Sequence, residues 1–231
     1  MVGAGETEGM ARTGNKEKKE TMVKLEHVKK AYKGNVLFTD LNLSVERGES
    51  CAIVGENGSG KSVLLKMVCG LVRPDAGDIT VGGEKLAKGK FPKDIGVILD
   101  NAGFLPNETG LKNLSIIAGI LRKVTKEELE ATMRLVGLDP ASQVKVGKYS
   151  LGMKQRLAIA QALMEKPSLL ILDEPFNAID ENTVKDFQTL LARLNTQEGV
   201  TILMTSHHQE EIQGLCGSIY RIASKDLKKI G

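Results

Sequence analysis

Apolar and polar residues alternate in two stretches near the start of the chain, separated by a turn signal at residues 33–35. The apolar positions are Val23, Leu25, Val28, Leu41, Leu43 and Val45. A period of two is typical of a strand with one buried face. The uninterrupted apolar run at residues 51–54 predicts a further, fully buried strand.

A helical period begins directly after this run. Apolar residues recur between Ser62 and Leu71, and Gly70 and Pro74 end the pattern. Short strand signals follow at residues 79–81 and 95–99. Residues 111–121, 126–136 and 151–164 have helical patterns, and Thr125 with Glu128 predicts a capping box for the second of them. Strand signals return at residues 169–172 and 200–205 with a helix between them, so the order predicts an α/β core with a helical insertion.

Composition narrows the class of protein. The 231 residues suffice for one large α/β domain. The 32 basic and 29 acidic residues are mixed, aromatic residues make up 3% and tryptophan is absent, so we expect no nucleic-acid partner. The three cysteines are dispersed without metal-binding spacing, which indicates reduced thiols in a cytoplasmic protein.

The two ends of the chain and its longest apolar runs suggest no membrane insertion. Residues 1–22 are polar and lack the apolar segment of a secretory signal, so we expect a disordered tail there. Residues 225–231 are expected to form a short C-terminal tail. No apolar run approaches the ~20 residues that span a bilayer. Any membrane role would therefore depend on a partner.

Residues 55–62, Gly-Glu-Asn-Gly-Ser-Gly-Lys-Ser, join the buried strand to the first helix. Glycines in such a loop let backbone N–H groups turn inward onto phosphate oxygens. Lys61 would bind the β- and γ-phosphates and Ser62 an Mg2+ ion, at the positive end of the helix dipole. A chance glycine-rich turn would match in roughly one chain in a hundred of this size. The predicted nucleotide-binding residues are Gly55, Asn57, Gly58, Ser59, Gly60, Lys61, Ser62 and Val63.

A second acidic motif follows the apolar run at residues 169–172. Asp173 comes at the carboxyl end of the expected strand, where an aspartate can hold Mg2+ together with Ser62. Glu174 is the candidate to polarise the attacking water. The alternative is an acidic turn without a ligand. The two motifs together predict ATP hydrolysis with Mg2+ rather than nucleotide binding alone.

Residues 149–156, Tyr-Ser-Leu-Gly-Met-Lys-Gln-Arg, open a predicted helix and resemble the signature motif of ATP-binding-cassette (ABC) proteins. The resemblance runs from about residue 23 to residue 222. It includes residues 177–180, similar to a D-loop, and residues 205–207, similar to the loop that carries the switch histidine His207. It implies an α/β fold of the P-loop NTPase class: a RecA-like core (23–100 and 166–224) with an antiparallel β subdomain, and an inserted α-helical subdomain (101–165).

The resemblance also implies a site that two chains share. In this family two nucleotide-binding domains, identical or related, pair head to tail. Ser150 and Gly152 would contact the γ-phosphate held by the partner domain, whereas the loop, metal and acidic residues and His207 would act on the chain's own ATP. Tyr32 resembles the aromatic residue that stacks on adenine. The alternatives are a packed surface tyrosine for Tyr32 and a strand-end histidine without a ligand role for His207.

Two motifs depart from the family pattern, the signature motif and the Q-loop. Leu151 and Met153 replace a glycine and a glutamine of the usual signature, a form similar to cassettes that serve bacterial exporters of bacitracin, lantibiotics and drugs. Asp100 stands where the Q-loop glutamine is expected. Its carboxylate could ligate Mg2+, although it adds negative charge near a triphosphate.

The leading hypothesis is therefore the ATPase subunit of a bacterial ABC transporter, held at the inner face of the cell membrane by a transmembrane permease. A groove for that permease would involve apolar residues of the helical insertion, for which packing in the core is the alternative. They are Phe104, Leu105, Leu111, Leu114, Ile116 and Ile117. Two other functions stay open: a soluble cassette ATPase acting on the ribosome or DNA, and a regulatory nucleotide-binding module without catalysis.

Overall fold

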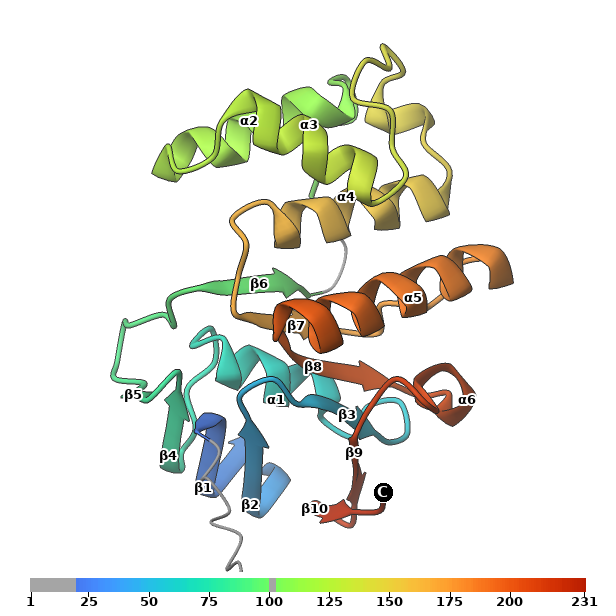
Figure 1. The fold of residues 1–231 in the computed structure, drawn as a ribbon. Helices are drawn as coiled ribbons and strands as arrows, with labels where there is room; N and C mark the ends of the chain where they lie inside the picture. Colours follow the sequence, from blue (N-terminus) through green and yellow to red (C-terminus); the bar gives the residue numbers. More distant parts are fainter. Residues whose placement is uncertain (1–19, 100–102) are drawn as a thin grey trace, which may run out of the picture.

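The computed structural model describes residues 20–99 and 103–231 (Figure 1). Most of the predicted tail, residues 1–19, lies outside this part of the chain. Asp100, the predicted third metal ligand, also lies outside the described residues.

The first sheet is antiparallel and comes from the two alternating stretches of the sequence. Its strands are β1 (Thr21–Tyr32), β2 (Asn35–Glu46), β4 (Ala76–Val81) and β5 (Glu84–Lys85), in the order β2-β1-β4-β5. The chain enters β1 at Thr21 rather than at Val23, because Met22 is buried and extends the apolar face of the strand. The predicted tail at residues 1–22 therefore extends too far at its C-terminal end.

The second sheet has six strands in the order β10-β9-β3-β8-β7-β6. They are β3 (Ser50–Val54), β6 (Ile95–Ile98), β7 (Leu169–Leu172), β8 (Thr201–Ser206), β9 (Ser218–Ala223) and β10 (Asp226–Lys229). All neighbours pair in parallel except β9 and β10. Strands β3, β7 and β8 are buried throughout, as expected for parallel strands covered on both faces. Their carboxyl ends share one edge of the sheet, where ligands bind in such folds.

The predicted C-terminal tail at residues 225–231 is wrong. Residues 226–229 form β10, which pairs with β9, and Leu227 is buried against the core. Polar side chains on both strands hid these elements from the hydrophobic pattern.

Six α-helices and one 3-10 turn accompany the sheets in the described part of the chain. They are α1 (Lys61–Val68), α2 (Gly110–Leu121), α3 (Lys126–Leu135), the turn Val146–Lys148, α4 (Leu151–Leu163), α5 (Glu181–Glu198) and α6 (Gln209–Ile212). The predicted capping box of α3 is confirmed: Thr125 and Glu128 exchange side-chain to backbone hydrogen bonds. None of the helices in residues 20–99 and 103–231 has the length and apolar character needed to cross a membrane.

The helices cover the six-stranded sheet unequally. Alternate residues of β3 point to its two faces: Cys51 and Ile53 pack with α1 and the antiparallel sheet, and Ala52 and Val54 pack with the side of α4 and α5. Helices α2 and α3 stand farther out, with α4 between them and the sheet (Figure 1). At Gly96 in β6 an added Cβ would lie 2.1 Å from the carbonyl oxygen of Ala162, so α4 packs directly on the sheet edge there.

Candidate functional site

The loop between β3 and α1 has the backbone shape that the glycines were expected to allow. Gly58 and Gly60 have φ angles of 79° and 105°, in the left-handed region that side chains disfavour. At Gly60 a Cβ would also lie 2.6 Å from Cζ of Phe38, a buried residue of β2. The antiparallel sheet therefore supports the loop from outside, a contact that the sequence did not predict.

Lys61 is held inside the curve of this loop. Its side chain is 6% exposed, and Nζ donates to the carbonyl oxygens of Gly55 (2.8 Å) and Glu56 (3.3 Å). It also forms an ion pair with Oε1 of Glu174 at 3.2 Å. A buried ammonium group needs such partners, and the same position suits it to meet phosphate oxygens at the start of α1. Ser62 follows in the first turn of this helix.

Strand β8 positions the two carboxylates that follow β7. The hydroxyl of Thr205 donates to Oδ1 of Asp173 (2.6 Å) and accepts from the backbone N–H of Glu174 (2.9 Å). Glu174 has a φ of 46°, an uncommon conformation for a residue with a side chain and one that occurs at functional sites. Thr205 is thus a positioning residue for both carboxylates.

His207, directly after β8, completes a cluster around Glu174. Its backbone N–H donates to Oε2 of Glu174 (3.2 Å), and Nδ1 lies 2.7 Å from the same oxygen. Burial alone would raise the pKa of Glu174, but hydrogen bonds from His207 and Lys61 outweigh it, so the pKa falls below its ordinary value of 4.5. Glu174 is therefore ionised at neutral pH.

This lowered pKa gives a pH dependence of stability with a definite sign. The ionised form of Glu174 is favoured more in the folded than in the unfolded chain, so its contribution is present above about pH 4.5 and is lost as pH falls through the folded pKa. The difference in melting temperature between the wild type and Glu174→Gln measures this contribution. We expect the wild type's advantage to decrease as the pH is lowered from about 5 to about 3. A difference that rises or stays constant over this range would contradict the assignment.

The role of Thr205 can be separated from general stability with a matched pair of variants. Thr205→Val leaves the partly buried N–H of Glu174 without its acceptor, so we expect a loss of about 1–3 kcal/mol in the free energy of unfolding and slower ATP hydrolysis. Thr201, buried in the same strand, accepts from the N–H of Gly48 at 2.9 Å. Thr201→Val should destabilise the chain similarly and leave the hydrolysis rate per folded molecule unchanged. Equal effects of both variants on that rate would contradict the role of Thr205.

The predicted trans residues lie elsewhere. Ser150 caps α4, its hydroxyl accepting from the N–H of Met153 (3.2 Å). Gly152 faces α5, where an added Cβ would lie 3.4 Å from Oγ1 of Thr183. The first turn of α4 and the loop before α1 lie toward the same side of the molecule, and α5 lies between α4 and this loop (Figure 1). The structure therefore brings Lys61, Asp173, Glu174 and His207 together, and leaves Ser150 and Gly152 apart from them.

Tyr32 ends β1 at the hairpin to β2 and is 45% exposed. The ammonium group of Lys30 lies 4.9 Å from its ring centroid. An exposed ring with a neighbouring cation can stack on a purine base, so Tyr32 stays a candidate for that role, with a surface tyrosine packed against Lys30 as the alternative.

A cavity of about 870 Å³ adjoins the loop. It is lined by residues 35–37, 54–59, 207, 209 and 221–225, and so partly by the segment that leads from β9 to β10. The cavity therefore brings the first residues of the phosphate loop and His207 to one hollow, whereas Lys61 and Asp173 are not among its lining residues.

The donor set fits Mg2+. Mg2+ prefers oxygen ligands and usually takes one or two protein groups, completing its shell with water and substrate phosphates. The Ser62 hydroxyl and the Asp173 carboxylate supply such oxygens. Within residues 20–99 and 103–231 no group of three or more His, Cys, Asp or Glu side chains could hold a metal ion by itself.

The chain is similar in sequence to known proteins of one family. A family model described as "ABC transporter" matches residues 38–177. The chain is 41% identical over 196 residues to the uncharacterized ABC transporter ATP-binding protein YybJ of Bacillus subtilis, covering 84% of this chain and 89% of YybJ. It is 38% identical over 197 residues to the bacitracin transport ATP-binding protein BcrA of Bacillus licheniformis, covering 84% of this chain but only 64% of BcrA.

Among solved structures, the dimeric, post-hydrolysis structure of the ATP-binding cassette MJ0796 bound to ADP and Pi superposes with a TM-score of 0.81. It covers 91% of this chain and 99% of that cassette at 24% identity. At this identity the likeness supports the fold: the α/β, P-loop NTPase architecture predicted from the sequence is confirmed.

Proposed function

Since this chain belongs to the ABC transporter family as an ATP-binding protein, and is therefore an ATPase, we propose that it drives a separate membrane permease that exports a peptide antibiotic or drug. The observation that carries its catalytic part is the cluster of Lys61, Glu174 and His207 beside the phosphate loop. A regulatory module without catalysis would not require an ionised glutamate in this place.

We assign the chemistry to residues of the cluster as follows. Lys61 binds the β- and γ-phosphates and thereby leaves Glu174. The freed carboxylate accepts a proton from the attacking water, and His207 holds Glu174 in position through the second oxygen. Ser62 and Asp173 would hold Mg2+, which would supply positive charge to neutralise that of the phosphates. We further propose that Tyr32 stacks on the adenine, with Gly55, Asn57, Gly58, Ser59, Gly60 and Val63 forming the phosphate loop.

A second nucleotide-binding domain is part of this proposal. Ser150 and Gly152 lie apart from the chain's own cluster, at the N-terminus of α4, a helix of 13 residues whose positive end suits an anion. We propose that they meet the γ-phosphate bound by a second domain arranged head to tail. The division into a core at residues 23–100 and 166–224 and a helical subdomain at residues 101–165 is part of the same proposal.

The surface for the permease is assigned to α2 and the segment before it. Of the predicted groove residues, Leu114 is fully buried, and Phe104, Leu111 and Ile117 pack against the core, so core packing is the right reading for these. Four apolar side chains of α2 and the segment before it are exposed, two of them from the predicted groove, and we assign all four to the permease contact. They are Leu105 (49% exposed), Ile116 (44%), Ile120 (76%) and Leu121 (56%). This contact would place the chain at the inner face of the cell membrane.

Two similarities support the substrate class. The signature variant with Leu151 and Met153 resembles that of peptide-antibiotic exporters, and BcrA is named for bacitracin transport. The chain spans only 64% of BcrA, so the substrate of BcrA is a proposal for this chain.

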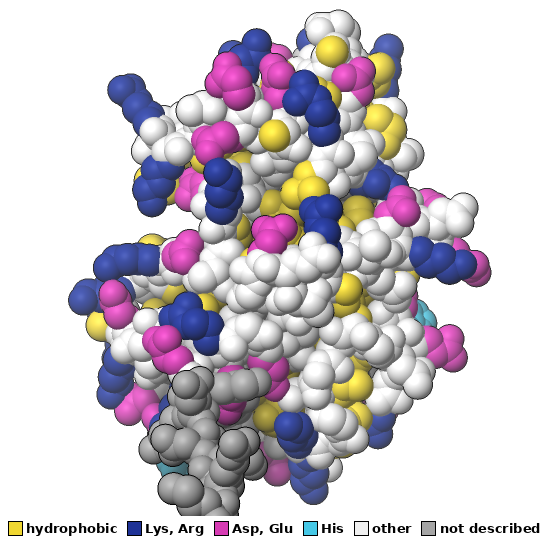
Figure 2. All heavy atoms as spheres, in the orientation of Figure 1, with side chains coloured by type: hydrophobic (Ala, Val, Ile, Leu, Met, Phe, Trp, Pro, Cys, Tyr) yellow, Lys and Arg dark blue, Asp and Glu magenta, His cyan; other side chains and the backbone are white. Residues whose placement is uncertain are grey.

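Purification of the tagged chain from membranes of its own host tests the function. We expect it to bring a multi-span membrane protein with it, and the complex in lipid vesicles to hydrolyse ATP faster when bacitracin is added. Recovery with ribosomes or DNA instead would favour the soluble alternative. The interspersed acidic and basic side chains on the face shown in Figure 2 do not favour DNA. A membrane complex whose ATP hydrolysis does not respond to peptide antibiotics would contradict the proposed substrate class and leave the proposed transporter function standing.

A further inference from the structure

The segment that follows Glu174 runs beside the first two turns of α4. Glu174 begins a turn in which the N–H of Asn177 donates to its carbonyl oxygen (3.1 Å). Phe176 anchors the segment in the core at 2% exposure. The segment ends at Asp180, whose carboxylate caps α5 by accepting from the N–H of Thr183 (3.1 Å).

Two contacts join this segment to α4. The side-chain amide of Gln155 donates through Nε2 to the carbonyl oxygen of Pro175 at 2.9 Å. Nearer the start of α4, a Cβ added at Gly152 would lie 3.8 Å from Oδ2 of Asp180. A directional hydrogen bond thus holds the residue next to Glu174 to the helix that begins at Ser150, and the side chain of Asp180 at the end of the segment lies near Gly152 of that helix.

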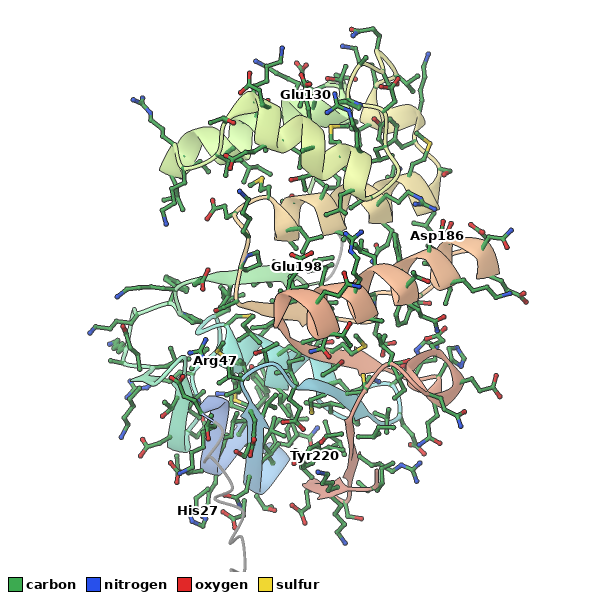
Figure 3. The ribbon with its side chains drawn as sticks, in the orientation of Figure 1. His27, Arg47, Glu130, Asp186, Glu198 and Tyr220 are labelled. Carbon is green, nitrogen blue, oxygen red and sulfur yellow. The ribbon has the colours of Figure 1, made fainter. Side chains whose placement is uncertain are left out.

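The neighbouring Arg156 fixes the rest of the helix. Its Nη2 donates to Oδ2 of Asp186 (2.7 Å) and its Nη1 to the carbonyl oxygen of Val136 (2.9 Å). Figure 3 shows Asp186 on the side of α5 that faces α4. With this anchor to α3 and α5, a displacement at Pro175 would act on the first turns of α4.

We propose that Gln155 is a positioning residue that couples the chain's own ATP site to the half-site it offers to the partner. The inference rests on the proposed function, in which Glu174 serves the chain's own nucleotide and Ser150 serves the nucleotide of the second domain. When phosphate binds, Lys61 leaves Glu174, the segment at residues 174–180 adjusts, and the hydrogen bond from Gln155 transmits the change to α4. In a dimer, this link would connect the two ATP sites through each chain.

Hydrogen exchange with Mg-ADP tests the link in the monomer. ADP occupies the phosphate loop but lacks the γ-phosphate that Ser150 is proposed to meet. Light scattering first establishes that the protein is monomeric at the concentration used. Any change at residues 150–156 must then travel through the chain. We expect exchange rates there to change by about fivefold or more, the lower end of typical coupling between two sites.

Gln155→Met is the decisive variant, because it keeps the length of the side chain and removes the donor. It should retain ADP protection of residues 55–62 and lose the change at residues 150–156. Gln188→Met is the matched control: Gln188 also donates through Nε2 to a backbone carbonyl, that of Glu211 at 2.8 Å. The control should keep the change.

Three results would overturn the proposal: no change at residues 150–156 in the wild type, a change that persists in Gln155→Met, or an equal loss in the control. A wild type in which ADP fails to protect residues 55–62 would instead count against the proposed function. If Gln155→Met does not fold, Gln155→Ala provides the same comparison, with the melting temperature as a check.

Discussion

Glu174→Gln is expected to lower the rate of ATP hydrolysis by about 10²–10⁴-fold, the usual contribution of a positioned general base. Glutamine is nearly isosteric and keeps an oxygen for His207, but it cannot accept the proton from water. It also removes the ion pair with Lys61, so ATP binding should be retained or become tighter. Phosphate release and binding of a fluorescent ATP analogue measure the two effects separately.

Glu198→Gln is the matched control for this variant. Glu198 ends α5 on the surface of the molecule (Figure 3), away from the loop and the acidic cluster. Its replacement should leave hydrolysis unchanged. If Glu174→Gln keeps the wild-type turnover, Glu174 is not the general base.

Gly152→Asp should lower the rate of ATP hydrolysis by about 10²-fold or more. A loss of this size is usual when a group that stabilises developing charge is removed. The new carboxylate would lie beside Asp180 and would repel the γ-phosphate of the partner's ATP. Because the nearest atom to an added Cβ is at 3.4 Å, the chain should still fold and bind one ATP. Equilibrium binding of ATP to the monomer and the steady-state rate of hydrolysis measure ATP binding and catalysis separately.

The control for Gly152→Asp is the same substitution at Gly119. Gly119 lies near the end of α2 with no heavy atom within 4 Å of an added Cβ. Gly119→Asp should hydrolyse ATP like the wild type when no permease is present. Loss of ATP binding by monomeric Gly152→Asp would show that Gly152 acts within its own chain, against the proposal.

The sequence predicted most elements because their hydrophobic periods are strong. The loop at residues 55–62 joins a strand to a helix as expected, and the acidic pair follows a buried strand. Strands β9 and β10 escaped prediction because Arg221, Lys228 and Lys229 interrupt their apolar pattern. Met22 was assigned to the tail because a single apolar residue beside a polar segment cannot show the alternation that predicts a strand.

The geometry of the site depends on contacts that no local pattern specifies. The parallel register pairs Leu172 with Met204, which places the next residue of each strand, Asp173 and Thr205, side by side. The left-handed backbone at Glu174 and the contact of Gly60 with Phe38 follow from the packing of the two sheets. The sequence could therefore name the reacting residues but not the hydroxyl that positions them.

The mass of Glu174→Gln in the presence of ATP tests the central claim that two chains complete each ATP site. Light scattering should give twice the 25.0 kDa of one chain with ATP and Mg2+ and a single chain without nucleotide. Adding Gly152→Asp to the same protein should return it to a monomer that still binds ATP. A protein that binds ATP and stays monomeric, or a dimer that survives Gly152→Asp, would contradict the shared site.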